Sequence, residues 1–221
     1  MIRGAIFDID GTVLDSMLFW KYAPEPFLKN IGLELEPDVG QATLFKSIQE
    51  IAEILKTEYN IETSEDAIIS EISGTIKKFY KYDVRLKEGV GQFITDLKKA
   101  GIKITAATFS ERQNVENALK RLGVIKYFDR IFTCAEIGAG KEKPDIYMTA
   151  AGFMGTTPEE TWVFEDALYA VKTAKNAGFR TAGVYDPTSE EYAEELKTVS
   201  DIYFEKFNNS KAFLDFASGS A

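Results

Sequence analysis

Residues 8–15 read Asp-Ile-Asp-Gly-Thr-Val-Leu-Asp, and they continue a short apolar run that begins at Ile2. An apolar run of this length that ends in acidic residues favours a buried strand over a helix. Asp8 and Asp10 stand two residues apart, so both carboxylates lie on one side of the chain at the end of that strand. In an open parallel sheet, ligands bind at the carboxyl ends of the strands. The stretch therefore predicts a first parallel strand that ends in a pair of reactive carboxylates.

Two simpler interpretations of this stretch compete with a catalytic one. Asp-x-Asp-Gly is common in turns, where it has no further function. A calcium-binding EF-hand loop that starts at Asp8 would place Gly at its sixth position and Glu at its twelfth. Those positions hold Val13 and Phe19, which excludes the calcium loop. The choice between a turn and a site depends on which other polar residues share this edge.

The rest of the chain alternates between strand and helix patterns. Short apolar runs predict strands at residues 102–108, 130–134, 161–164, 180–185 and 201–204. Helical periodicity lies between them, at residues 90–100, 111–122, 145–153, 167–177 and 189–196. Ser110 is the expected N-cap of the second of these helices. This alternation predicts an α/β fold built from right-handed βαβ units around a parallel sheet.

One long segment breaks the alternation. From residue 16 to residue 83 the pattern is helical only, as in Ile48, Ile51, Ala52 and Leu55, which recur along one helix face. We therefore predict an all-helical insert at residues 16–83. The α/β core domain then comprises residues 1–15 and 84–221.

Three more predicted strand ends carry polar side chains. Thr108 closes one strand, Lys141 follows another, and Glu165-Asp166 closes a third. Alone, Thr108 is typical of the edge of a helix cap, and Glu165-Asp166 could equally cap the next helix. Gly140-Lys141 is not a phosphate-binding P-loop, because Glu142 stands where that motif requires Ser or Thr. Together with Asp8 and Asp10, however, all these groups fall at one edge of one predicted sheet.

These residues carry a family resemblance that spans essentially the whole chain. The motifs, in chain order, are Asp-x-Asp-Gly-Thr at 8–12, Thr108, Lys-x-x-Pro-Asp-Ile at 141–146 and Glu-Asp at 165–166. They resemble the four motifs of the haloacid dehalogenase superfamily. A helical insert just after the first motif resembles the cap domain of its C1-capped phosphatases and β-phosphoglucomutase-like proteins. The resemblance implies a Rossmann-like core, with helices on both faces of the sheet, and an aspartyl-phosphate mechanism.

The resemblance also implies a role for each motif. Asp8 would be the nucleophile, and Asp10 would act as general acid and then as general base. Thr108, the backbone N–H of Phe109 and Lys141 would hold the transferring phosphoryl group. The metal would be held by the Asp8 carboxylate, the Asp10 carbonyl and Asp166, with Glu165 either a ligand or a neighbour of one.

The charge balance independently calls for a cation. Asp8, Glu165 and Asp166 bring three negative charges and a phosphate brings about two more, whereas Lys141 offers one positive charge. An oxygen-only ligand set without His or Cys favours Mg²⁺ over zinc. We therefore expect Mg²⁺ as the cofactor.

Several departures from the family pattern refine these expectations. The dehalogenases lack the second Asp, so Asp10 points to phosphoester chemistry. Ala167 follows Glu165-Asp166 where the family often has Ser, and Phe109 replaces an amide residue of the second motif. The mutase relatives place a His near the position of Trp20, but this chain has no His.

Composition limits the partners of the protein. The 221 residues carry a net charge of −9, which disfavours nucleic acid and anionic lipid as partners. No apolar run approaches the length of a membrane span, about 18 residues. The single cysteine, Cys134, permits no internal disulfide and fits a cytoplasmic location. We expect a monomer.

The leading hypothesis is a Mg²⁺-dependent phosphatase that hydrolyses a small phosphorylated metabolite. A phosphosugar mutase of the β-phosphoglucomutase type would use the same nucleophile and is the alternative. The third possibility is a non-catalytic module that binds phosphorylated metabolites.

Overall fold

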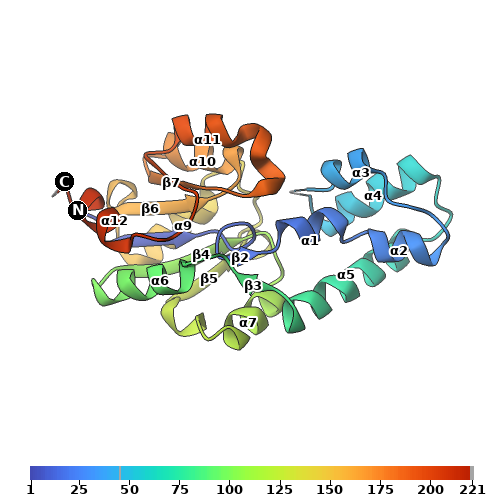
Figure 1. Cartoon of the computed structure of the whole chain (residues 1–221), viewed down its shortest axis with the longest axis horizontal. Helices are drawn as coiled ribbons and strands as arrows, with labels where there is room; N and C mark the ends of the chain where they lie inside the picture. The colour runs from blue at the N-terminus through green and yellow to red at the C-terminus, as the bar shows by residue number, and fades with distance from the viewer. Residues whose placement is uncertain (45, 220–221) are drawn as a thin grey trace. The chain divides into compact units, whose positions relative to one another are not determined.

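The computed structural model describes residues 1–44 and 46–219. The chain divides into two compact units, Met1–Asp15 with Arg85–Ala221 and, separately, Ser16–Val84 (Figure 1). We call the first the core unit and the second the helical insert. Each is described here by itself.

A six-stranded parallel sheet forms the centre of the core unit. Its strands, in chain order, are β1 (Gly4–Phe7), β4 (Lys103–Thr108), β5 (Arg130–Thr133), β6 (Thr161–Glu165), β7 (Arg180–Val184) and β8 (Ile202–Phe204). Their spatial order is β5-β4-β1-β6-β7-β8, which is the order of Rossmann-like folds. The chain runs outward in opposite directions from β1, so the sheet has its switch point beside that strand. This is where open α/β sheets bind ligands.

Helices connect the strands of the core unit. They are α6 (Val90–Lys99), α7 (Arg112–Arg121), α8 (Cys134–Ile137), α9 (Asp145–Met154), α10 (Leu168–Asn176), α11 (Ala193–Val199) and α12 (Ser210–Ala217), with short 3₁₀ turns η1 (Ile125–Tyr127), η2 (Pro158–Glu160) and η3 (Pro187–Tyr192). The predicted α/β fold with a helical insert is confirmed.

One face of the sheet is covered by aromatic side chains. Phe7 and Phe164 are paired in register on β1 and β6, and their rings stack with centroids 4.2 Å apart. Phe93 of α6 packs edge-on against both rings, and Phe213 of α12 packs edge-on against Phe164. Favourable ring geometry contributes about 0.5–1.5 kcal/mol per pair beyond the burial itself. These contacts fix α6 and α12 on this face.

Smaller side chains cover the opposite face. Strand side chains alternate, so Ile6 and Val163 point away from the aromatic face. They pack in one core cluster with Ile146 and Ala150 of α9 and with Ala174 of α10. The sheet therefore lies between two helical layers, as expected for a three-layer α/β/α core.

A small antiparallel ribbon was not predicted from the sequence. It pairs β2 (Leu14–Asp15) with β3 (Arg85–Leu86), the two segments at which the core unit meets the ends of the insert. The loop between β1 and β2 turns at Gly11, whose φ of 88° is a conformation that favours glycine. This turn holds Asp8 and Asp10 close to the carboxyl end of β1.

The helical insert contains α1 (Met17–Tyr22), α2 (Glu25–Asn30), α3 (Pro37–Ala42), α4 (Ile48–Tyr59) and α5 (Glu65–Tyr82). No strand occurs among its described residues. The apolar stripes of the two longest helices are buried, with Leu55 of α4 and Ile72 of α5 fully enclosed. Ser47 caps α4 through a capping box with Glu50. Among its described residues, helices are therefore the only regular secondary structure of the insert.

Three local predictions are corrected. Ser110 is not the N-cap of α7, which begins at Arg112 with Glu111 in the capping position. The single helix expected at 189–196 is a 3₁₀ turn followed by α11, because the chain kinks at Ser189. Helix α12 was not expected at all.

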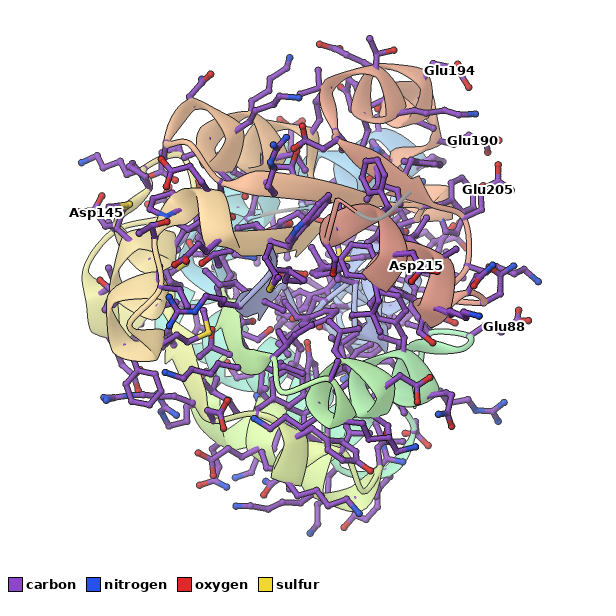
Figure 2. The ribbon with its side chains drawn as sticks, turned by 90° about the vertical axis from the view of Figure 1, so that its left-hand side faces the viewer. Glu88, Asp145, Glu190, Glu194, Glu205 and Asp215 are labelled. Carbon is purple, nitrogen blue, oxygen red and sulfur yellow. The ribbon has the colours of Figure 1, made fainter. Side chains whose placement is uncertain are left out.

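The surface of the core unit carries many carboxylates. Figure 2 shows Glu190, Glu194, Glu205 and Asp215 extending outward, and all four are exposed. Exposed acids of this kind contribute to the net charge of −9. Among the described residues, no helix is long and apolar enough to cross a membrane.

Candidate active site

The polar groups predicted at strand ends meet at one edge of the sheet. Asp8 directly follows β1, Thr108 is the last residue of β4 and Glu165 is the last residue of β6. The strands β4, β1 and β6 are neighbours in the sheet, and the backbone N–H of Asp8 donates to Phe164 (2.9 Å). Adjacent strands lie about 5 Å apart, so their end residues are within reach of one another.

Lys141 connects two of these strand ends. Its side chain is buried, with only 2% of the residue exposed, although it lies in a loop between α8 and α9. The ammonium group donates to Asp8 Oδ1 and to Glu165 Oε1, the latter at 2.6 Å. Burial alone would lower the pKa of Lys141, but the two carboxylates raise it well above its ordinary value. Lys141 is therefore a fixed positive charge.

Three buried carboxylates form an acidic cluster made of Asp8, Glu165 and Asp166. One oxygen from each lies within 4.8 Å of the others. One oxygen of each residue is buried without a hydrogen-bond partner: Asp8 Oδ2, Glu165 Oε2 and Asp166 Oδ2. Burial and the neighbouring carboxylates raise the pKa of Asp8 and of Asp166 well above the ordinary value, although Lys141 and Lys87 respectively oppose the shift.

The acidic cluster fits a hard divalent cation. A buried acceptor without a partner costs roughly 1–3 kcal/mol, and more when it is charged. Lys141 supplies one positive charge against three carboxylates, so the cluster is under-compensated. Carboxylate oxygens without nitrogen or sulfur donors are the ligand set that Mg²⁺ and Ca²⁺ use. The unpartnered oxygens are thus candidate metal ligands.

Asp10 stands two residues after Asp8 and is less buried than the acidic cluster. The Asp10 carboxylate is one of the charges that raise the pKa of Asp8, after burial and Glu165. The Ser110 hydroxyl donates to Asp10 Oδ2 at 2.7 Å. The Ser110 backbone N–H donates to Thr108 Oγ1 at 3.0 Å. The segment after β4 thereby connects Thr108 to Asp10.

Phe109 is the predicted site residue whose side chain contributes least. Its ring is 47% exposed, and the ring centroid lies 6.0 Å from the Lys141 ammonium group. The sequence prediction concerned only its backbone N–H.

Residues that sequence reasoning did not assign support the cluster. The Tyr147 hydroxyl donates to Glu165 Oε1 (3.0 Å), and the Thr12 hydroxyl donates to Asp166 Oδ1 (3.3 Å). Lys87 pairs with the buried Asp186 (2.7 Å). Thr12 and Tyr147 stand inside or next to the quoted motifs, so they could have been found; nothing in the sequence marks the Lys87–Asp186 pair.

Comparison with known proteins agrees with this geometry. The family model of haloacid dehalogenase-like hydrolases matches residues 5–184. The β-phosphoglucomutase of Bacillus subtilis is 28% identical over 194 residues, covering 83% of each chain. The phosphorylated carbohydrates phosphatase of Thermotoga maritima is 25% identical over 177 residues, covering 80% of this chain and 82% of that protein.

A solved structure shows the same fold. The crystal structure of β-phosphoglucomutase from Clostridium difficile superposes with a TM-score of 0.77 at 20% identity, covering 99% of this chain and 98% of the other. At this identity the similarity concerns the fold alone. The family match spans most of the chain, from the first strand to the end of β7. The chain therefore belongs to the haloacid dehalogenase-like hydrolases.

Proposed function

We propose that the protein is a Mg²⁺-dependent phosphatase that hydrolyses a small phosphorylated metabolite through an aspartyl-phosphate on Asp8. The observation that carries this proposal is Lys141, a buried ammonium group that bridges Asp8 and Glu165 beside unpartnered carboxylate oxygens. Such a site combines a nucleophile with fixed positive charge for a phosphoryl group.

In the first half-reaction, a carboxylate oxygen of Asp8 attacks phosphorus. The bond between phosphorus and the ester oxygen breaks, and the electron pair stays on that oxygen. Asp10 gives its proton to the departing oxygen, which leaves as an alcohol. Asp10 is half-buried whereas Asp8 is buried, and this difference in burial supports the division of roles between them.

In the second half-reaction, water attacks the phosphorus of the acyl phosphate. Asp10, now a carboxylate, accepts a proton from that water. The bond between phosphorus and the Asp8 oxygen breaks, which releases inorganic phosphate and restores the Asp8 carboxylate. Both half-reactions therefore use the same two aspartates, and the proton that Asp10 gives to the leaving oxygen is replaced by the one it takes from water.

Other residues would hold the phosphoryl group during both steps. Thr108 and the backbone N–H of Phe109 would donate to its oxygens, and Lys141 would offset its charge. Asp8, the backbone carbonyl of Asp10 and Asp166 would hold Mg²⁺, with Glu165 a ligand or a neighbour. When bound, Mg²⁺ would reduce the repulsion between the acidic cluster and the phosphoryl oxygens.

Substrate and context complete the proposal. The helical insert would act as a cap that selects small substrates and limits water at the site. The relative from Thermotoga maritima is named for phosphorylated carbohydrates, so sugar phosphates are the first class to assay. The net charge disfavours nucleic acid, and the single cysteine fits the cytoplasm. The proposed state is a monomer.

The test is phosphate release by wild-type protein and by Asp8→Asn across phosphorylated sugars with Mg²⁺. We expect Asp8→Asn to lose about 10⁴-fold or more in rate while remaining folded, because the nucleophile is lost. Asp215→Asn, which changes an exposed aspartate, should keep wild-type activity. Intact-mass measurement after acid quench should find phosphate on the wild-type chain only. Substantial turnover by folded Asp8→Asn would refute the covalent mechanism.

A phosphosugar mutase is the second candidate, favoured by the similarity to the Bacillus subtilis enzyme. The chain has no His, and the Trp20 indole N–H donates to Tyr80 within the insert (3.0 Å). An indole cannot accept a proton from a sugar hydroxyl. Incubation with β-glucose 1-phosphate and a trace of the 1,6-bisphosphate separates the two functions. Glucose 6-phosphate formed without inorganic phosphate would favour the mutase.

A further inference from the structure

We propose that Ser110 is a positioning residue that orients Asp10 for proton transfer, an inference that rests on the proposed phosphatase function. The Ser110 hydroxyl donates to Asp10 Oδ2 at 2.7 Å, although the two residues are 100 positions apart. This distance is well within the range of an O–H···O hydrogen bond. The bond joins the segment after β4 to the loop after β1.

Ser110 is itself held in place. Only 7% of the residue is exposed, and its backbone N–H donates to Thr108 Oγ1 at 3.0 Å. Thr108 is the buried last residue of β4 and pairs in register with Thr133 of β5. The serine hydroxyl is therefore presented from the end of a central strand, which is a rigid support.

Asp10 belongs to a different segment from Ser110. It stands in the loop that turns at Gly11, and its side chain is half-buried. An aspartate has two rotatable side-chain bonds, so an added hydrogen bond from a fixed donor selects one orientation among several. Catalysis is sensitive to such selection, since a small misplacement of a reacting group costs rate.

The bond holds the carboxyl group that exchanges a proton in the proposed reaction. A serine hydroxyl has one proton to donate, and here Asp10 Oδ2 accepts that hydrogen bond. In the first half-reaction Asp10 would give a proton to the leaving oxygen as the bond between that oxygen and phosphorus breaks. In the second half-reaction Asp10 would take a proton back from water.

A purely structural role for Ser110 would be helix capping, as the sequence suggests. Helix α7 instead has Glu111 in the capping position and begins at Arg112. The hydroxyl of Ser110 donates across to Asp10 in the first motif. Removal of this hydroxyl should therefore change proton transfer more than it changes the fold.

The test compares two esters that differ in how much they need a proton. Phenol is a much weaker acid than 4-nitrophenol, so phenyl phosphate depends on general acid catalysis and 4-nitrophenyl phosphate depends on it little. We expect Ser110→Ala to lower kcat/KM about tenfold for phenyl phosphate and less than about threefold for 4-nitrophenyl phosphate. Ser110→Thr, which keeps a hydroxyl, should recover most of the loss.

Ser189→Ala is the matched control. Ser189 is also 7% exposed, but its hydroxyl has no hydrogen-bond partner, so its removal should leave both rates unchanged. If Ser110→Ala does not fold, Ser110→Cys replaces it, because a thiol fills similar space and is a weak donor. An equal loss on both esters, or no loss, overturns the positioning role. Wild-type protein that releases no phosphate from these esters or from the phosphorylated sugars would instead contradict the proposed phosphatase function.

Discussion

The core unit and the helical insert bury different kinds of side chain. Among the described residues, the buried charged side chains all lie in the core unit: Asp8, Lys141, Glu165, Asp166 and Asp186. The buried polar residues of the insert are Ser16 and Thr43, and the rest of its described interior is apolar. Buried charge normally costs stability unless it is fully compensated. The core unit thus carries a cost that only function explains, whereas the insert follows ordinary rules of helix packing.

This difference predicts how each region responds to mutation. A change in the acidic cluster should mainly alter activity and ion binding, because the cluster is held for chemistry. A change in the apolar interior of the insert should mainly alter stability. The predictions below test that division, and they run from the largest expected effect to the smallest.

Of the effects that test this division, the largest is expected at Lys141. Lys141→Ala should lower the phosphate-release rate about 10²–10³-fold, as is typical when one preorganised charge-stabilising group is removed. Asp8 and Glu165 would lose the ammonium group that they share. Steady-state kinetics with a phosphorylated sugar measures the effect. Lys143→Ala is the control, since Lys143 is exposed two residues away, and it should be nearly silent. A damaging Lys143→Ala with an active Lys141→Ala would mean that the third motif is assigned in the wrong register.

The next effect concerns the interior of the insert. Leu55 is fully buried in α4, so Leu55→Ala should cost about 2–5 kcal/mol in the free energy of unfolding of the insert. The rate per folded molecule should change little, because no charged group of the acidic cluster is altered. Urea denaturation followed by circular dichroism measures the loss. The matched variant is Ile69→Ala on α5, where the side chain is only half-buried and the cost should be clearly smaller. Comparable costs at both positions would contradict the packing argument.

The two regions were also predictable to different degrees from the sequence. The parallel sheet and the helical insert could be predicted from the spacing of apolar residues. Positions that face the interior, such as Phe7 and Leu55, hold apolar side chains because they are buried. The ribbon of β2 and β3 was missed because each strand has two residues, too few for any period to appear.

The acidic cluster was predictable because strand ends at a switch point converge, and the motif residues Asp8, Glu165 and Asp166 stand there. The partners of these residues were harder to predict. The sequence predicts that Ser110 caps a helix, because capping depends only on residues that are close in sequence. In the structure its hydroxyl donates to Asp10. A contact between segments 100 residues apart depends on the tertiary structure. The Lys87–Asp186 pair was unpredictable for the same reason.

A smaller effect is expected from Mg²⁺ on thermal stability. Burial raises the pKa of Asp8 and of Asp166 in the folded protein. A carboxyl group whose pKa is higher folded than unfolded destabilises the protein above its unfolded pKa, and the penalty disappears as the pH falls. Metal-free protein should therefore lose stability as the pH rises above about 4, the ordinary pKa of an aspartate, toward the raised pKa values of these two groups in the folded protein. Mg²⁺ binds the ionised form, so its stabilisation should grow with pH.

Differential scanning calorimetry checks this dependence. We expect Mg²⁺ at about 10 mM, in excess over the protein, to raise the melting temperature by a few degrees at about pH 8 and by less at about pH 5. Asp166→Asn should abolish most of the shift, and Asp215→Asn should keep it. A shift that is larger at acidic pH would show that protons and Mg²⁺ do not compete in the acidic cluster.

The smallest effect is expected at the capping box of α4, where the insert uses polar groups for structure alone. The Ser47 hydroxyl accepts from the backbone N–H of Glu50 (3.2 Å), and the Glu50 carboxylate accepts from the backbone N–H of Ser47 (2.8 Å). Hydrogen bonding to Ser47 lowers the pKa of Glu50, so the box is intact when Glu50 is ionised. Ser47→Ala should therefore cost about 1 kcal/mol of stability at neutral pH. Ser47→Asp, which keeps a capping oxygen, should recover part of that stability, and neither variant should change the rate per folded molecule. A change in rate without a change in stability would mean that the insert, like the core unit, holds polar groups for chemistry.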